Sequence, residues 1–195
     1  TGMAAVTTAI LAPLKAGDHV VASRALFGSC LYVIQDLLPR YGIETTLVDG
    51  ANLDEWQRAV RPNTKTFFLE SPTNPTLDVL DIPSIAEIAH RGGARLVVDN
   101  VFATPIWQSP LALGADVVVH SISKYISGGA DVIAGAVCGP ASLIDDMMGL
   151  QQGALMLLGP TMNPKVAFEL SERLPHLALR MKEHCHRAMT YAARL

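Results

Sequence analysis

The sequence has few charged residues and no long apolar run, and each shortage excludes a class of protein. Charged residues make up 17% of the 195 positions and hydrophobic residues 50%, which is the balance of a globular chain rather than a disordered one. The formal net charge of −3 gives no reason to expect nucleic acid or an anionic membrane as a partner. No apolar stretch approaches the roughly 20 residues that a membrane-spanning helix needs, so no membrane partner is expected.

Cysteine is also scarce. The three cysteines are odd in number and far apart, so they form no disulfide framework, and this usage is typical of a reducing, cytoplasmic compartment. His184 and His186 flank Cys185, but side chains two positions apart on a helix point away from each other. The paired spacings of zinc ligands are absent, and no metal site is expected.

Short apolar stretches alternate with segments of helical periodicity through most of the chain. We expect strands at residues 18–22, 43–48, 65–69, 95–99, 117–119 and 131–138, of which the last can run antiparallel, and helices at 2–14, 27–38, 53–60, 82–91 and 143–150. This alternation predicts an α/β fold with a mostly parallel sheet covered by helices on both faces. The length is sufficient for one domain with a sizeable core.

A long helical pattern runs from Asn163 to Leu195. Asn163 suits the N-cap and Pro164 the first helical position, whereas Pro175 should kink or interrupt the helix. The pattern reaches the last residue without a stop signal, and the first helix starts at Gly2 with no strand before it. We therefore expect a chain truncated at both ends, in which residues 161–195 lead from a domain over residues 1–160 toward a C-terminal domain.

Lys124 is the strongest candidate for chemistry. An apolar strand over 117–119 runs into His120, and a turn with Ser121 and Ser123 then precedes this one lysine and two glycines. Burial at the end of such a strand would lower the pKa of a lysine and make it a usable amine nucleophile. Such an amine typically forms a Schiff base with a carbonyl, including that of pyridoxal 5'-phosphate (PLP). The alternative is a surface lysine in a turn between strand and helix.

Asp99 ends another apolar strand, at residues 95–99. PLP enzymes place an aspartate against the pyridine nitrogen and keep that nitrogen protonated, which strengthens the ring as an electron sink. Asp99 and Lys124 should lie at the carboxyl ends of two parallel strands, where open α/β sheets bind ligands. The alternative is that Asp99 is a helix N-cap after a strand. It explains Asp99 less well, because it does not account for the pairing of Asp99 with Lys124.

Four motifs carry a resemblance to a known family, in its order and spacing. They are Thr1-Gly-Met-Ala-Ala5, Glu70-Ser-Pro-Thr-Asn-Pro-Thr76, Val98-Asp-Asn-Val-Phe-Ala-Thr-Pro105 and His120-Ser-Ile-Ser-Lys-Tyr125. With these motifs the chain resembles the Cys/Met metabolism (trans-sulfuration) PLP-dependent enzymes over essentially all 195 residues. The resemblance implies the type I, aspartate-aminotransferase-like fold, with residues 1–160 as the PLP-binding large domain. It also implies a homo-oligomer (a dimer of dimers) and a small sulfur amino acid or acylated homoserine as substrate.

The resemblance also implies a role for each matching residue. Lys124 would bind PLP covalently, and Asp99 would pair with the pyridine nitrogen. Phe27 would stack on the cofactor ring, and Asn74 would lie near its O3′ atom or the substrate. The phosphate would be held by the backbone amides of Gly2 and Met3, at a helix start where amides and dipole favour an anion, and by the Ser121 and Ser123 hydroxyls. In the family, the arginine that binds the substrate carboxylate comes from the C-terminal domain.

Two halves of the chain resemble different members of this family. Up to about His120 it is similar to bacterial O-succinylhomoserine sulfhydrylases, through Ala25-Leu-Phe-Gly-Ser-Cys30 and Glu70-Ser-Pro-Thr-Asn-Pro75. From His120 on it is similar to methionine γ-lyases of the plant type, through Ser127-Gly-Gly-Ala-Asp-Val-Ile-Ala-Gly135 and Leu157-Leu-Gly-Pro-Thr-Met-Asn163.

Phe27 favours the sulfhydrylase. Lyases of the family usually carry a tyrosine there, whose phenol can protonate a departing thiolate, whereas phenylalanine can only stack. A succinate leaving group needs little protonation, because its conjugate acid is far more acidic than a thiol. The sequence therefore predicts γ-replacement on an activated homoserine to give homocysteine, a step of methionine biosynthesis. A carbon–sulfur lyase and a non-catalytic PLP-binding homologue are the alternatives, and intact Lys124 and Asp99 argue against the second.

Overall fold

The computed structural model describes residues 1–151 and 153–195 and contains one six-stranded mixed sheet. The strands are β1 (His19–Ser23), β2 (Glu44–Val48), β3 (Thr64–Glu70), β4 (Arg95–Asp99), β5 (Val117–His120) and β6 (Ala136–Cys138). Their order is β2-β1-β3-β4-β5-β6, with β1 to β5 parallel and β6 antiparallel to β5. The predicted mostly parallel α/β sheet is confirmed, including the antiparallel last strand.

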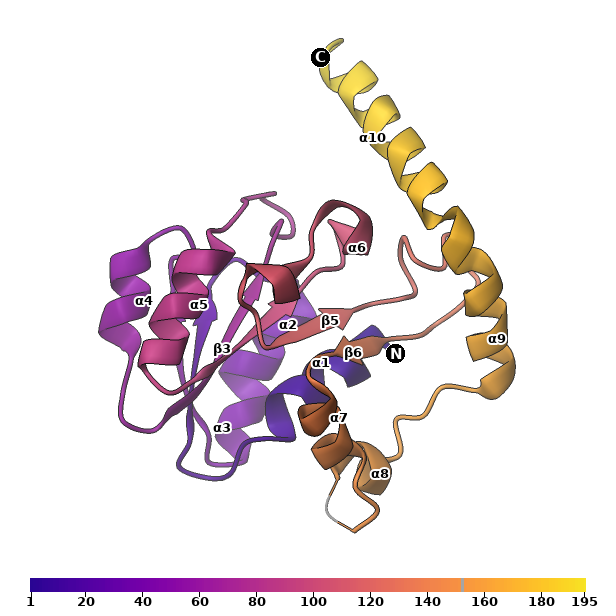
Figure 1. Cartoon of the computed structure of the whole chain (residues 1–195). Helices are drawn as coiled ribbons and strands as arrows, with labels where there is room; N and C mark the ends of the chain where they lie inside the picture. The colour runs from indigo at the N-terminus through magenta and orange to yellow at the C-terminus, as the bar shows by residue number, and fades with distance from the viewer. Residues whose placement is uncertain (152) are drawn as a thin grey trace.

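Helices cover both faces of this sheet (Figure 1). The side chains of β3 and β4 alternate between two apolar clusters. One cluster joins them to α4 (Leu53–Ala59) and α5 (Ile82–Arg91). The other joins them to α1 (Gly2–Leu11), α2 (Gly28–Tyr32), the π-helix η1 (Val33–Leu37) and α3 (Leu38–Arg40). Burial on both faces explains why these strands read as continuous apolar runs.

The helix predicted at residues 27–38 differs in detail. Phe27 is the N-cap rather than part of the helix, and the middle of the segment winds as the π-helix η1 before ending at Arg40. The first helix ends at Leu11 rather than Leu14, because Pro13 has no N–H with which to continue the ladder.

After β4 come the short helix α6 (Thr104–Trp107) and the 3-10 helix η2 (Pro110–Leu113), which lead to β5. The strand predicted over 131–138 forms only at β6, and residues 131–135 run outside the sheet. The Ser123 hydroxyl and the backbone of Ala134 bond each other in both directions, at 2.9 and 3.1 Å, and Val132 and Ala134 pack against Leu170. These contacts replace strand pairing in that segment.

The last part of the chain is helical. It comprises α7 (Ala141–Met148), α8 (Ala154–Leu158), α9 (Pro164–Arg173), a 3-10 turn η3 (Leu174–His176) and α10 (Leu177–Ala192). As predicted, Asn163 is the N-cap, and its side chain accepts the Lys165 N–H at 2.9 Å. The 3-10 turn at Pro175 is the predicted interruption. In Figure 1, α10 projects beyond the sheet and its covering helices.

Among residues 1–151 and 153–195, no helix is both long and apolar enough to cross a membrane. No group of three or more His, Cys, Asp or Glu side chains in these residues is arranged to hold a metal ion.

Candidate active site

The candidate site lies at the carboxyl edge of the parallel strands. β3 ends at Glu70, β4 at Asp99 and β5 at His120, and the strand register pairs Glu70 with Asp99 and Asp99 with Val119. The turn with Lys124 follows β5 directly. The fold therefore brings the motifs around residues 70, 99 and 124 to one edge, as expected of an open α/β sheet.

Asp99 is a buried carboxylate. It is 6% exposed, and the hydrogen bond that the described residues provide to its side chain is the Val101 N–H, 3.0 Å from Oδ1. Burial raises the pKa of Asp99 to about 6, and the Val101 hydrogen bond partly offsets this rise. A buried carboxylate with so few donors is suited to a cationic or N–H partner, such as a protonated pyridine nitrogen.

Glu70, to which sequence reasoning gave no role, lies beside Asp99. It is 4% exposed, and its Oε2 accepts the Phe27 N–H at 2.8 Å. Burial, and then the charge of Asp99, raise the pKa of Glu70 to about 7, against hydrogen bonds from the Phe27 and Asn74 backbones. One carboxylate thus ties the segments that carry Phe27 and Asn74 to the end of β3. An acid at the end of a buried strand was the signal, the same one that identified Asp99.

A side-chain network, also unforeseen, fixes the Asp99 strand end. Asn100 donates from Nδ2 to the carbonyl oxygens of Thr104, at 3.2 Å, and Gln108, at 3.0 Å. The Gln108 side chain donates back to Asn100 Oδ1 and to the Ser71 carbonyl, each at 2.9 Å. Thr104 is fully buried in the left-handed region with φ of 57°, which a β-branched residue adopts only under constraint. The network locks the end of β4 to the end of β3.

Lys124 lies in the turn beyond β5 rather than in the strand, and it is exposed. The prediction that Lys124 is buried is therefore wrong, because the strand ends at His120 and the turn carries the lysine past the apolar layer. His120 itself is buried, and its Nδ1 has no hydrogen-bond partner among the described residues. Desolvation lowers the pKa of the His120 imidazole.

The structure places Gly2 next to Ser121. A Cβ placed on Gly2 would lie 2.6 Å from the Cβ of Ser121, and one placed on Gly135 would lie 2.7 Å from the carbonyl carbon of Thr1. There is no room for a Cβ at either position, because the Ser121 side chain lies against Gly2 and the Thr1 backbone lies against Gly135. The Thr1 hydroxyl accepts the Ala4 N–H at 3.0 Å, which leaves the Gly2 and Met3 amides without intrahelical partners. Two such amides at a helix start are suited to donating to an anion.

Ser123 is placed differently from Ser121. Its hydroxyl donates its one proton to the Ala134 carbonyl at 3.1 Å and accepts the Ala134 N–H at 2.9 Å. It could donate to a phosphate only after the bond to the carbonyl is given up. Phe27 is 44% exposed at the start of α2, and Asn74 is half-buried in the loop after β3.

A cavity of about 410 Å³ adjoins the start of α1. It lies between the residues around Thr1, the segment 133–137, helices α7 and α8, and the segment 160–166. Neither Lys124 nor Asp99 lines it. The candidate site at the sheet edge is therefore separate from this cavity.

The raised pKa of Glu70 gives a pH-dependent stability prediction. Below its ordinary pKa of 4.5 the side chain is neutral in the folded and unfolded states, whereas between 4.5 and about 7 only the folded state keeps the proton. Raising the pH through this window therefore destabilises the wild type relative to Glu70→Gln, on the order of 3 kcal/mol by pH 8. Gln keeps an acceptor for Phe27.

Urea unfolding of the cofactor-free protein at pH 4.5, 6 and 8 measures this difference. Comparing the two proteins is necessary because burial also lowers the pKa of His19 to about 4, which gives wild-type stability an opposite slope in the same range. A constant difference between the two midpoints across all three pH values would contradict the raised pKa.

Comparison with known proteins agrees with this site. A family model described as Cys/Met metabolism PLP-dependent enzyme matches residues 1–195. The chain is 53% identical over its whole length to a methionine gamma-lyase of Arabidopsis thaliana, covering 44% of that protein. It is 44% identical over 93% of its length to an O-succinylhomoserine sulfhydrylase of Mycobacterium tuberculosis, again covering 44% of the relative.

Solved structures give the same result for the fold. The crystal structure of metB from Corynebacterium glutamicum matches 99% of the chain with a TM-score of 0.92 and 37% identity, and 49% of that structure is covered. A cystathionine gamma-lyase from Lactobacillus plantarum, complexed with L-serine, matches all of the chain with a TM-score of 0.92 and 34% identity, and 50% of it is covered. The chain thus spans about half the length of these relatives, and it belongs to the Cys/Met metabolism PLP-dependent enzymes.

Proposed function

We propose that this chain carries the PLP-binding part of a trans-sulfuration enzyme acting at the γ-carbon of a sulfur amino acid or an activated homoserine. The observation that carries the proposal is the buried Asp99 carboxylate at the same sheet edge as the Lys124 turn. A homologue that had lost catalysis would gain nothing from a carboxylate buried with so few donors. Family membership supports the same reading.

The residues of the site fit the cofactor. PLP, when bound, supplies an electron sink that stabilises negative charge at the substrate α-carbon. Lys124 would hold it covalently, and the free amine of Lys124 would act as the base that moves the α-proton. Asp99 is ionised above the pKa of about 6 and keeps the pyridine nitrogen protonated, and this cation in turn favours the ionised carboxylate.

The remaining predicted residues orient the cofactor. The Gly2 and Met3 amides and the hydroxyls of Ser121 and Ser123 would hold the phosphate, and the Ser123 hydroxyl would have to give up its bond to the Ala134 carbonyl to donate there. Phe27, whose backbone N–H is anchored on Glu70, would stack on the ring, and Asn74 would lie near O3′ or the substrate.

The proposal extends to the whole protein. It includes a homo-oligomer built as a dimer of dimers, a cytoplasmic location and a small-molecule substrate. The division into a large domain over residues 1–160 and a helix over 161–195 that leads to a C-terminal domain also stays a prediction.

For the reaction itself we propose γ-replacement, as in an O-succinylhomoserine sulfhydrylase. Phe27 provides no acid for a departing thiolate, so the site favours a carboxylate leaving group, which departs without a proton. The second candidate, methionine γ-lyase, is favoured by the 53% identity to the Arabidopsis protein, and similarity alone supports the two activities equally.

Product analysis distinguishes the two reactions. We expect O-succinylhomoserine with sulfide to give homocysteine faster than methionine gives methanethiol. Only the second reaction requires an acid that protonates the departing thiolate. Phe27→Tyr should raise methionine cleavage about tenfold by supplying that proton. Phe168→Tyr, the same change at an exposed position on α9, serves as the control and should leave both rates unchanged. Efficient cleavage of methionine by the unmodified enzyme, with acylated homoserine ignored, would establish the lyase instead.

A further inference from the structure

In the described part of the chain, the turn that carries Lys124 leaves several backbone carbonyl groups without backbone hydrogen-bond donors. Within this turn the Lys124 N–H donates to the Ser121 carbonyl at 3.1 Å. The Ser127 N–H donates to the Ile122 carbonyl and the Gly128 N–H donates to the Lys124 carbonyl, each at 2.9 Å. The segment is therefore a short helical turn, and a helical turn leaves its last carbonyl groups without backbone donors. Here these are the carbonyls of the three residues that follow the lysine.

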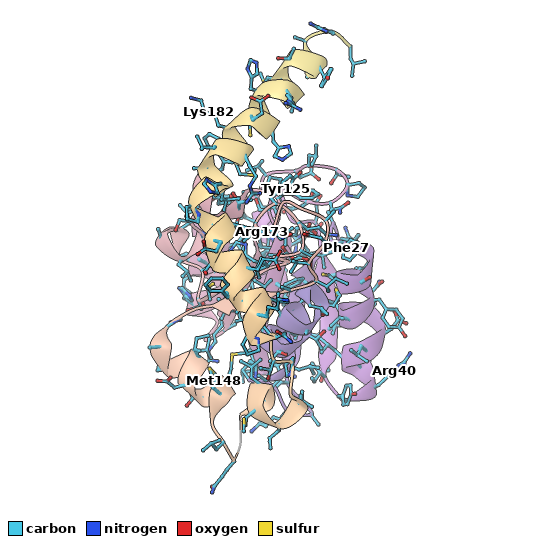
Figure 2. All side chains as sticks on the ribbon, turned by 90° about the vertical axis from the view of Figure 1, so that its right-hand side faces the viewer. Phe27, Arg40, Tyr125, Met148, Arg173 and Lys182 are labelled. Carbon is cyan, nitrogen blue, oxygen red and sulfur yellow. The ribbon has the colours of Figure 1, made fainter. Side chains whose placement is uncertain are left out.

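Two arginines from the last helices donate hydrogen bonds to these carbonyls. Arg180 of α10 donates to the Tyr125 carbonyl and, at 2.8 Å, to the Ile126 carbonyl. Arg173 of α9 donates to the Ser127 carbonyl at 3.3 Å. Figure 2 faces this side of the molecule and shows Arg173 and Tyr125 close together, where the last helices cross the body. A cation at the carboxyl end of a helical turn is favourable, and the planar fork of arginine spans two carbonyls as lysine cannot.

The two glycines after the lysine turn, Gly128 and Gly129, leave room for these arginines because they have no side chain. A Cβ on Gly128 would lie 2.8 Å from Cζ of Arg180, and φ at this glycine is 71°. A Cβ on Gly129 would lie 2.8 Å from Nη1 of Arg173. Arg173 also holds Asp131 through two hydrogen bonds of 2.6 and 2.8 Å. The loop sequence and the helix sequence are therefore matched to each other.

Apolar contacts reinforce the polar ones. Leu177 and Met181 of α10 form a cluster with Ile126, against which Ile122 and Tyr125 pack. The side chains on both sides of Lys124 are thus covered by the last helix, while the lysine itself stays exposed at the sheet edge.

We propose that Arg180 and Arg173 are positioning residues, which hold the Lys124 turn from α9 and α10 and thereby fix where the lysine amine stands. We call this pair of contacts the arginine clamp. The inference deepens the proposed function and rests on Lys124 being the cofactor lysine. It makes the last helices part of the site, although neither arginine touches the reacting atoms.

Hydrogen exchange of the cofactor-free protein tests the clamp independently of the proposed function. In Arg180→Lys the amides of Ser127 and Gly128 should exchange about tenfold faster, which corresponds to the loss of one hydrogen bond to a charged group. Gly129→Ala, which would place a Cβ 2.8 Å from Nη1 of Arg173 without altering either arginine, should give the same result. The control is Arg187→Lys, on the same helix, where the arginine pairs with exposed Glu183. Unchanged exchange in both test variants would overturn the clamp.

The positioning role is tested on the PLP-loaded protein. Arg180→Lys should shift the pH at which the absorbance of the lysine-bound cofactor titrates and should lower kcat about tenfold with little change in KM, while Arg187→Lys does neither. Faster exchange with an unchanged titration, and a borohydride adduct still on Lys124, would make the clamp merely structural and overturn the proposal. An adduct on another lysine would instead reject the proposed role of Lys124, and this inference with it.

Discussion

Replacing Lys124 by alanine is expected to reduce turnover on the order of a thousandfold or more, whichever substrate proves to be the right one. In the proposed function, the variant would lose both the covalent hold on PLP and the base that moves the α-proton. The fold should not suffer, since the side chain is exposed. Thermal unfolding of the cofactor-free variant should match the wild type to within about 0.5 kcal/mol.

Cofactor attachment gives a direct reading of the same prediction. Borohydride should fix PLP to Lys124, and peptide mapping should find the adduct on that residue. Lys182→Ala, at a lysine on α10, is the matched control and should keep both the adduct and the turnover (Figure 2). An adduct on Lys15, Lys65, Lys165 or Lys182 would contradict the assignment.

Replacing Asp99 by asparagine is expected to lower turnover on the order of a hundredfold or more, with only a modest loss of PLP affinity. Asparagine keeps the shape and the acceptor for Val101, but it cannot hold the pyridine nitrogen protonated. Steady-state kinetics and PLP titration of the variant measure the two effects separately. Asp116→Asn is the control. Asp116 also accepts a backbone hydrogen bond, from the Leu96 N–H at 2.7 Å, but it lies before the start of β5, at the opposite edge of the sheet from Asp99.

The same substitution, Asp99→Asn, is expected to raise the stability of the cofactor-free protein although it lowers turnover. The folded-state pKa of Asp99 is raised to about 6 from an ordinary 3.8, so the buried carboxyl destabilises the folded state once the pH rises through that window. The variant should therefore be the more stable protein at pH 8 and no more stable at pH 3.5. Near-normal turnover in Asp99→Asn would show that the carboxylate is only a structural cap.

Much of the fold was determined by the sequence alone. Strands such as Arg95–Asp99 are apolar runs bounded by polar residues, and the helix Ile82–Arg91 is predicted to the residue, because both periods and boundaries are local properties. The sequence also located the motifs around Gly2, Asp99 and Ser121, since residue type and order along the chain are sufficient to place them on strand ends and a helix start. Family membership follows from the same motifs.

The tertiary structure alone decided the environment of each group. Lys124 is exposed although it follows a buried strand, and residues 131–135 leave the sheet because Ser123 and Leu170 offer them other contacts. The carboxylate of Glu70 reaches the Phe27 amide across 43 positions, and Arg180 reaches Ile126 across 54. No local period encodes such pairs, because their free energy depends on two distant segments being brought to one edge of the sheet. Burial, pKa and the arginine clamp are for this reason properties of the folded chain and not of its motifs.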